Sequence, residues 1–263
     1  MSMRSLEEAL QGRNVEAVTV KIATTWDELE GAFRLVHQNY LRCGLTQPNV
    51  FDMRVTPYHL RSTTEVFVGI LRSEVVCCMT LVRDEGLGLP LEDIYSPEIS
   101  ALKARGVKLA EVSCLADRRG DFARSLPLVL RLMSLMAQCA KLRGVDMLVI
   151  AVHPRHVKFY ERFTCFRCIG EERAYHTVRD KPAVALALDL RRAPIDHPEE
   201  YRRFFGTPFS DAELAYRPIP ASLRERMRPI VEAGYFATGS RTCAECLPLP
   251  TDVPGPTSAV GST

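Results

Sequence analysis

Hydrophobic positions near the start of the chain alternate over a short run and then change to helical spacing. Residues 18–24 alternate and are rich in β-branched side chains, which predicts a strand. Thr25 precedes two acidic residues of the next turn, so it is the expected N-cap of a helix from Trp26 to Leu41. Apolar residues recur at helical spacing through that helix, and Gly44 is its expected end.

A strand pair and an insertion are expected next. Residues 46–63 hold prolines and no clear period, which indicates a loop with one short helix after Thr56-Pro57. Two alternating runs at 64–71 and 74–84 predict a hairpin, although its turn lacks the favoured Asn-Gly pair. Apolar residues within 86–106 then predict a short amphipathic helix that interrupts the strands and ends at a glycine.

The second half of the domain alternates between strands and helices. Residues 108–116 predict a strand and residues 123–143 a long helix, in which Pro127 is compatible only with the first turn. The unbroken apolar run 146–152 is typical of a buried parallel strand. A short helix at 156–163 should follow it.

The order of these elements predicts an α/β (α+β) fold. Residues 166–178 and 182–190 should form a last antiparallel pair, and the crossover at 108–152 should be parallel and right-handed. The pairs on both sides of the crossover are antiparallel, so we expect a mixed sheet of about seven strands with helices on both faces.

Composition along the chain divides it into four segments. Residues 1–17 form an N-terminal segment, and residues 18–190 carry the strand and helix pattern of one domain. Residues 191–246 are rich in Arg, Glu, Phe and Tyr and should form a helical C-terminal extension. Residues 247–263 are rich in Pro, Ser, Thr and Gly, which predicts a disordered tail.

The bulk composition is that of an ordinary globular protein, with 46% hydrophobic and 25% charged residues. A net charge of +2 gives no support for a nucleic-acid partner. No apolar run reaches the length of a transmembrane helix, and the stretch from Met1 to Glu8 does not resemble a signal peptide. We therefore expect a cytoplasmic protein, while peripheral membrane contact and the oligomeric state stay open.

The nine cysteines include two Cys-x-x-Cys pairs, Cys165/Cys168 and Cys243/Cys246. Such pairs can hold zinc, but these two lie much farther apart in the chain than in a compact zinc ribbon. The odd total also argues against a complete disulfide framework. We expect structural or incidental cysteines and no metal.

The segment from His156 to Phe166, HVKFYERFTCF, resembles the "FYERxGF" segment that GNAT (Gcn-type N-acetyltransferase) acyltransferases carry after their fifth strand. Thr164-Cys165 stands where those proteins usually have glycine. The order of elements from about 18 to 190 also resembles the GNAT superfamily. The resemblance implies a GNAT-like mixed sheet and an acyltransferase.

Three further segments resemble the N-acyl amino acid synthases (FeeM-like enzymes), which are similar to acyl-homoserine lactone synthases. They are the insertion LPLEDIY at 89–95 with Glu98, Ile99 and Leu102, the strand AEVSCLA at 110–116, and VHPRH at 152–156 with GEER at 170–173. The loop before the long helix, RRGDFA at 118–123, keeps only part of the glycine motif of acetyl-CoA-dependent members. The missing glycines favour a bulkier donor, delivered on a carrier protein.

Glu111 is the candidate general base. With strict alternation Glu111 and Ser113 share one face of their strand, and Val112 and Cys114 share the other. A carboxyl group in a half-buried strand has a raised pKa unless it is paired, which suits a base. The alternative is a salt-bridged or sheet-edge glutamate. The resembling families place a glutamate in this strand, which favours the catalytic role.

Other site residues follow from the resemblance. Tyr160 would protonate the leaving sulfur, or else would only pack against Phe159 and Phe163. The donor would be held along the strand and the loop after it, unless that loop is only a solvated basic surface. The expected donor-binding residues are Cys114, Leu115, Ala116, Arg118, Arg119, Gly120 and Arg124. The expected substrate-binding residues are Arg42, Tyr95, Ser113 and His153.

The resemblance thus implies an N-acyltransferase that moves a medium- or long-chain acyl group from acyl carrier protein or acyl-CoA to the amine of an amino acid. No cofactor is bound permanently, and the phosphopantetheine thioester is a substrate. The basic cluster Arg155, His156, Lys158 and Arg162 would attract an acidic carrier protein. The alternatives are a signal synthase of the acyl-homoserine-lactone type and a non-catalytic acyl- or partner-binding protein on a GNAT scaffold.

The whole hypothesis depends on one geometric expectation. The two parallel strands should diverge near 111–117 and 149–154, which would open a slot where an extended thioester lies beside Glu111.

Overall fold

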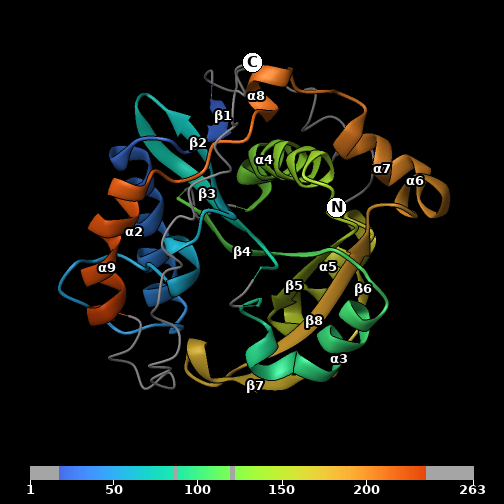
Figure 1. Ribbon diagram of the computed structural model, residues 1–263, viewed down its shortest axis with the longest axis horizontal. Coiled ribbons are helices and arrows are strands. Elements are labelled where there is room, and N and C mark those ends of the chain that lie inside the picture. Colours follow the sequence, from blue (N-terminus) through green and yellow to red (C-terminus); the bar gives the residue numbers. More distant parts are fainter. Residues whose placement is uncertain (1–17, 86–87, 119–121, 235–263) are drawn as a thin grey trace, which may run out of the picture.

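A mixed eight-stranded sheet forms the centre of the molecule (Figure 1). The computed structural model describes residues 18–85, 88–118 and 122–234. The sheet order is β1-β2-β3-β4-β5-β8-β6, and β7 pairs with β8 beside β6. The strands are β1 Thr19–Ile22, β2 Thr64–Leu71, β3 Glu74–Arg83, β4 Leu109–Asp117, β5 Met147–Val152, β6 Arg167–Cys168, β7 Arg173–Tyr175 and β8 Lys181–Asp189.

The strand pairing follows the hydrophobic pattern. β4 and β5 are parallel, whereas every other strand pair in the described ranges is antiparallel. The β2–β3 hairpin turns at Arg72 and Ser73, both with positive φ, so it has the left-handed geometry of a tight hairpin turn without Asn-Gly. The predicted mixed sheet with helices on both faces is confirmed. The predicted strand 166–178 is wrong, because this segment forms two short strands, β6 and β7.

Helices cover both faces of the sheet. They are α2 Trp26–Arg42, η1 Pro57–Leu60, α3 Glu92–Ala104, α4 Phe122–Leu142, α5 Pro154–Phe163, η2 His176–Val178, α6 Ala193–Asp196, α7 Pro198–Phe205, α8 Asp211–Leu214 and α9 Ala221–Gly234. α4 covers one face of the sheet (Figure 1). On the other face, α2 and α9 cover one half and α3 covers the other half. None of the helices described is long and apolar enough to cross a bilayer.

Local signals explain where the helices begin. Thr25 forms a capping box with Glu28 at the start of α2, as its position predicted. α5 begins at Pro154, earlier than expected, because a proline at the first helical position needs no hydrogen-bond acceptor for its nitrogen. Pro127 lies beyond the first turn of α4, so the expected limit on its position is wrong.

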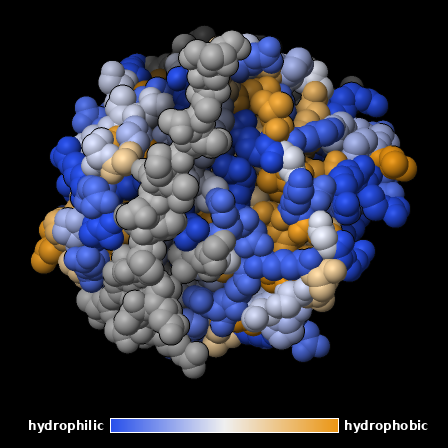
Figure 2. Space-filling view, in the orientation of Figure 1, coloured by the Kyte–Doolittle hydropathy of each residue, from blue (hydrophilic) through white to orange (hydrophobic). Residues whose placement is uncertain are grey.

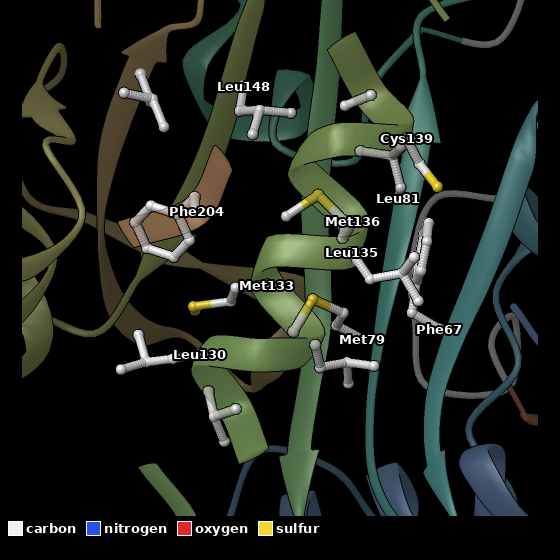
Figure 3. Packing of buried hydrophobic residues seen from close by; sticks show 14 of the residues in the cluster. Phe67, Met79, Leu81, Leu130, Met133, Leu135, Met136, Cys139, Leu148 and Phe204 are labelled. Atoms are coloured by element: carbon white, nitrogen blue, oxygen red, sulfur yellow. The ribbon is translucent and has the colours of Figure 1, made fainter. Parts of the chain in front are cut away.

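The largest hydrophobic core lies between α4 and the sheet (Figure 3). Leu132, Leu135 and Cys139 of α4 are completely buried there, next to Phe67 of β2 and Leu81 of β3. The hydrophobic side chains of α4 point into the sheet on one side and toward Phe204 of α7 on the other (Figure 3). Phe204 therefore makes the C-terminal extension part of this core.

The C-terminal extension contributes to both faces. On the α4 face, the Phe204 carbonyl accepts hydrogen bonds from Ser134 Oγ at 2.5 Å and Gln138 Nε2 at 2.8 Å. On the other face, Met227 and Ile230 of α9 are buried in the core formed with α2. The expected tail at 247–263 lies outside the described residues.

Candidate active site

A bulge in β4 separates it from β5. Cys78 and Thr80 of β3 pair with Ala116 and Ser113 of β4, so β4 has one extra residue between the two pairs. Cys114, within this bulge, has φ +54°, a left-handed conformation that is rare for residues other than glycine. A bulge bends its strand and increases its twist, so β4 turns away at this point.

The β4–β5 seam opens directly after Glu111. Parallel pairing runs only from Leu109–Met147 to Glu111–Val149, although β4 continues to Asp117 and β5 to Val152. The predicted divergence of the two strands is therefore present. Beyond Glu111, the backbone edge of β4 that faces β5 has no strand partner within the described chain, so its N–H and C=O groups are available to a ligand.

A cavity of about 160 Å³ lies at this opening. Its wall combines the ends of β4 and β5 with the end of α2, the loop before η1 and the connection between β7 and β8. Glu111, Ser113, Cys114, Ala151, Val152 and His153 line it from the two strands. The seam and the cavity thus form one continuous candidate site.

Glu111 lies in this wall as a buried carboxyl group with 3% exposure. Its Oε2 accepts a hydrogen bond of 2.7 Å from the backbone N–H of Leu91, the N-cap residue of α3. Burial raises the pKa of Glu111 to about 8, against the opposing effect of the Leu91 N–H; nearby Asp93 and Glu92 raise the pKa further. A carboxyl group with this pKa can accept a proton near neutral pH and has one oxygen fixed in place.

The β4 bulge changes which residues share the Glu111 face. Cys114 and Ala116 are buried in the core under α2, whereas Leu115 packs toward the α4 core. The expectation that Cys114 lies on the face opposite Glu111 and Ser113 is therefore wrong, because all three line the cavity. Burial raises the pKa of the Cys114 thiol, which disfavours the thiolate that a nucleophile requires.

Tyr160 lies on the α4 side of the sheet and does not line the cavity. Its ring makes edge contacts with Phe159 at 5.4 Å and Phe166 at 5.8 Å between centroids. Burial raises the pKa of Tyr160 to about 12, so its hydroxyl keeps its proton. The structure does not bring Tyr160 and Glu111 together in one cavity wall.

His153 is at the mouth of the site. It lines the cavity and caps α5, where its Nδ1 accepts a hydrogen bond of 3.3 Å from the Arg155 N–H. This capping role is compatible with contact to a ligand. Ser113 and His153 are the two predicted substrate-binding residues that the cavity includes.

Tyr95 and Arg42 lie elsewhere. Tyr95 is completely buried, and its hydroxyl lies 2.6 Å from the carbonyl oxygen of Ala183 and 2.8 Å from that of Glu171. These contacts fix α3 to β8 and favour a structural role. Arg42 is exposed at the end of α2, donates to Asn39, and lines a separate surface hollow with Arg118.

The predicted donor-binding loop is only partly described. Arg118 forms an exposed ion pair with Glu74, and its backbone N–H donates to the Val76 carbonyl at 2.9 Å. Arg119 and Gly120 lie outside the described residues, as does the side chain of Arg124 in the first turn of α4. Their predicted contact with the donor stays a prediction.

The seam also has an apolar approach on the α4 side. Partly buried apolar side chains pack against the core there from β4, β5 and α5: Leu115, Val152, Val157, Phe159 and Phe163. Figure 2 shows an apolar strip between hydrophilic residues on the visible face, over the region where Figure 1 draws α4 and the strands beside it. An apolar surface of this kind can hold a hydrocarbon chain.

Most of the cavity wall was not predicted as site residues, including the polar side chains of Tyr40, Arg54, Tyr58 and Tyr175. Tyr40 continues the helical spacing of apolar residues in α2, which is typical of core positions and gives no signal of a cavity residue. Arg54 lies in the aperiodic segment 46–63, where no spacing marks one residue over another. Only the folded chain brings this segment beside the β4–β5 seam.

The described cysteines do not form a Cys-x-x-Cys metal site. Cys165 is buried, whereas Cys168 is exposed and its Sγ lies 3.2 Å from the Gly170 carbonyl oxygen. Cys165 instead lies beside His197 and Glu200, with candidate ligand atoms within 4.8 Å of one another. An Arg167 guanidinium lies 3.1 Å from Nε2 of His197, and this positive charge disfavours a cation there. Cys243 and Cys246 lie outside the described residues.

Comparison with known proteins gives one family. The family model "N-acyl amino acid synthase FeeM" matches residues 31–189. No protein of curated function matches the chain. Among solved structures, FeeM, an N-acyl amino acid synthase from uncultured soil microbes, matches with a TM-score of 0.59 and 24% identity, over 67% of this chain and 94% of that chain.

Two acyl-homoserine lactone synthases have a similar fold. LasI matches with a TM-score of 0.53 and 16% identity, over 73% of this chain and 96% of its own. The CoA-dependent synthase BjaI matches with a TM-score of 0.51 and 18% identity, over 73% of this chain and 92% of its own. The GNAT-like fold expected from the sequence is confirmed.

Proposed function

Because the chain belongs to the FeeM family of N-acyl amino acid synthases and is therefore an acyltransferase, we propose that it transfers a medium- or long-chain acyl group from a phosphopantetheine thioester to the amine of an amino acid. The opening of the β4–β5 seam beside the buried Glu111 is the observation that carries this proposal. The product is an N-acyl amino acid and a free thiol.

The donor would lie extended in the seam. The unpaired backbone edge of β4 offers hydrogen bonds to the amide groups of pantetheine, as a sheet edge does to an extended peptide. The phosphate would lie near the N-terminus of α4, where free N–H groups and the helix dipole favour an anion. The apolar approach beside α5 would hold the acyl chain.

We propose acyl carrier protein as the main donor, with acyl-CoA as the alternative. Arg155 and Lys158 of α5 are exposed beside the end of β5, next to the seam. Positive charge at this place would attract an acidic carrier and orient its pantetheine arm toward the seam.

The reaction requires one base and one acid. The amine nitrogen bonds to the thioester carbonyl carbon, and ionised Glu111 takes a proton from that nitrogen. The C–S bond then breaks, and its electron pair leaves with the sulfur as a thiolate. Protonation of this thiolate gives the free thiol. We propose the Tyr160 hydroxyl, on the α4 side of the sheet, as the donor of this second proton. The Glu111 carboxyl then releases its proton to solvent and the Tyr160 phenolate takes one up, which returns both groups to their starting states.

Product analysis tests the proposed function. The protein is incubated with acyl carrier protein or CoA thioesters of hexanoyl to palmitoyl chains, together with pooled amino acids or S-adenosylmethionine. Mass spectrometry should detect N-acyl amino acids. An acyl lactone made only with S-adenosylmethionine would indicate a signal synthase instead, and the absence of any acylated amine with every donor would contradict an acyltransferase of this type.

Tyr160→Phe tests the assigned acid in the same assay. The turnover number should fall by about a hundredfold because the variant lacks the proton donor. Phe166→Leu is the control for packing in the same aromatic group, since it removes a ring that contacts Tyr160 but no hydroxyl. Equal turnover in Tyr160→Phe and the wild type would leave Tyr160 as a packing residue only.

A further inference from the structure

Arg54 places a positive charge inside the candidate active site. Its side chain lines the cavity from the loop between α2 and η1. The guanidinium lies over the ring of Tyr40, 4.8 Å from the ring centroid, and its Nη2 donates to the Thr177 carbonyl at 3.3 Å. Contacts on two sides therefore hold the guanidinium plane in a fixed orientation.

This guanidinium is partly buried and has no anionic partner among the described residues. Its Nε is buried and has no hydrogen-bond partner in the structure. No carboxylate forms an ion pair with Arg54 in the part of the chain that the structure describes. An unpaired charge in a cavity wall is costly, and an incoming anion would remove that cost.

Glu111 does not take the role of this anion. The Glu111 carboxylate accepts its hydrogen bond from the Leu91 N–H, and no ion pair joins it to Arg54 among the described residues. The cavity therefore has a proton acceptor in one wall and a separate cation in another. An amino acid has the complementary pair of groups, an amine and a carboxylate.

We propose that Arg54 binds the α-carboxylate of the acceptor amino acid, so that the acceptor amine points toward Glu111. The proposal rests on the proposed function, because it assigns the acceptor to the same cavity. A guanidinium matches a carboxylate with two parallel N–H donors, so it favours amino acids over amines without an anionic group. Tyr40 lies beside the same site, and burial raises its pKa, so its hydroxyl stays available as a further donor.

A second anion, the donor phosphate, could use the same chemistry. The two anions predict different kinetics. If Arg54 binds the acceptor carboxylate, loss of Arg54 would raise the KM of the acceptor. If it binds the donor phosphate, the KM of the acyl donor would rise instead. Kinetic constants for both substrates are therefore part of the test.

The first experiment uses the wild-type protein. It compares free amino acids with the corresponding α-carboxamides as acyl acceptors. A carboxamide keeps the amine and the side chain but has no negative charge. Amino acids should react with a kcat/KM on the order of tenfold to a hundredfold higher than their carboxamides. Equal values would overturn the Arg54 proposal and leave N-acyl transfer intact, whereas no product with any amine would contradict the proposed function itself.

The second experiment uses Arg54→Gln, Arg54→Lys and the control Arg61→Gln. Arg61 is the C-cap of η1, close to Arg54 in the chain, and lies outside the cavity wall. Arg54→Gln should raise the KM of the amino acid on the order of tenfold to a hundredfold, while the KM of the donor and the reaction of the carboxamide stay unchanged. Arg54→Lys should restore part of the affinity because it keeps the charge without the paired donors.

Thermal unfolding accompanies these assays, so that a folding defect is not taken for lost affinity. A selective rise in the KM of the donor with Arg54→Gln would assign the site to the donor phosphate and overturn the proposal. An equal loss with the amino acid and its carboxamide would also overturn it, as a general structural effect.

Discussion

Glu111 and Glu65 are two glutamates in strands with apolar neighbours, and their contacts give them different roles. Glu65 of β2 forms a two-point ion pair with Arg143, at 2.8 Å and 3.1 Å. Glu111 has a backbone N–H as its hydrogen-bond partner and faces a cavity. Sequence pattern cannot distinguish a paired from an unpaired carboxylate, because the partner Arg143 is distant in the chain. For Glu111, the resemblance to enzymes with a glutamate in this strand supplied the distinction.

The raised pKa of Glu111 predicts a pH-dependent stability. Its pKa rises from 4.5 to about 8 on folding, so the folded state binds the extra proton between these values. The stability that this group contributes is therefore complete below 4.5 and is lost as the pH rises through about 8. Glu111→Gln does not titrate, and its amide oxygen can still accept from Leu91.

The melting temperature of Glu111→Gln should consequently increase relative to the wild type as the pH rises between these two pKa values. Scanning calorimetry across this range measures the difference. Glu172→Gln, at an exposed position, is the control and should give a constant difference. A Glu111→Gln protein that loses stability relative to the wild type with rising pH would contradict the assigned pKa shift.

At the scale of elements, the sequence predicts the strands and helices well but not the irregularities that make the site. The hydrophobic pattern marks β4 and β5 as strands, because the sheet face on which a strand residue lies follows from its position in the local sequence. The bulge at Cys114 has no such signal, since a positive φ at a cysteine is imposed by pairing with β3. Strict alternation therefore gave the wrong face for Cys114. It also missed Arg54, which lies in an aperiodic loop.

Tyr95→Phe tests whether α3 supports the site or binds substrate. The Tyr95 hydroxyl lies within hydrogen-bond distance of the carbonyl oxygens of Ala183 and Glu171, so its one proton joins α3 to β8 and the segment before β7. Its removal should lower the free energy of unfolding by about 1–3 kcal/mol and leave the KM of the acceptor unchanged. Urea unfolding and steady-state kinetics measure the two quantities. Tyr216→Phe, which removes an exposed hydroxyl bond to the Ser62 carbonyl, should have a smaller effect on stability.

A rise in the KM of the acceptor without any loss of stability in Tyr95→Phe would instead support direct contact with substrate.

For the whole molecule, the C-terminal helices are integral to the domain core. Arg143, at the end of α4, joins three parts of the chain through Glu65 of β2 and the Leu214 carbonyl of α8, which it donates to at 2.6 Å. Composition shows that the chain changes character after 190, but it does not reveal which face the later helices cover. That arrangement depends on packing such as that of Phe204 against the α4 core and of Met227 in the core shared with α2.

Arg143→Met should destabilise the protein by about 3–5 kcal/mol, because it leaves the fully buried Glu65 without its cation. The double variant Glu65→Leu with Arg143→Met removes both charges and should recover part of this loss. The free energy of unfolding is measured by chemical denaturation for the wild type, both single variants and the double variant. The four values give the coupling energy between Glu65 and Arg143. Strictly additive effects would contradict a direct buried ion pair. Arg192→Met, which removes the cation of the exposed pair with Asp196, is the control.

The central claim is that Glu111, beside the opened β4–β5 seam, accepts the proton of the acceptor amine. The most direct test is the pH dependence of kcat/KM for N-acylation in the wild type and Glu111→Gln. The wild-type value should rise with an inflection near the pKa of about 8, whereas Glu111→Gln should be slower by at least about a hundredfold and lack that inflection. Titration of the amine itself affects both proteins equally. An unchanged rate and an unchanged inflection in Glu111→Gln would show that another group accepts the proton.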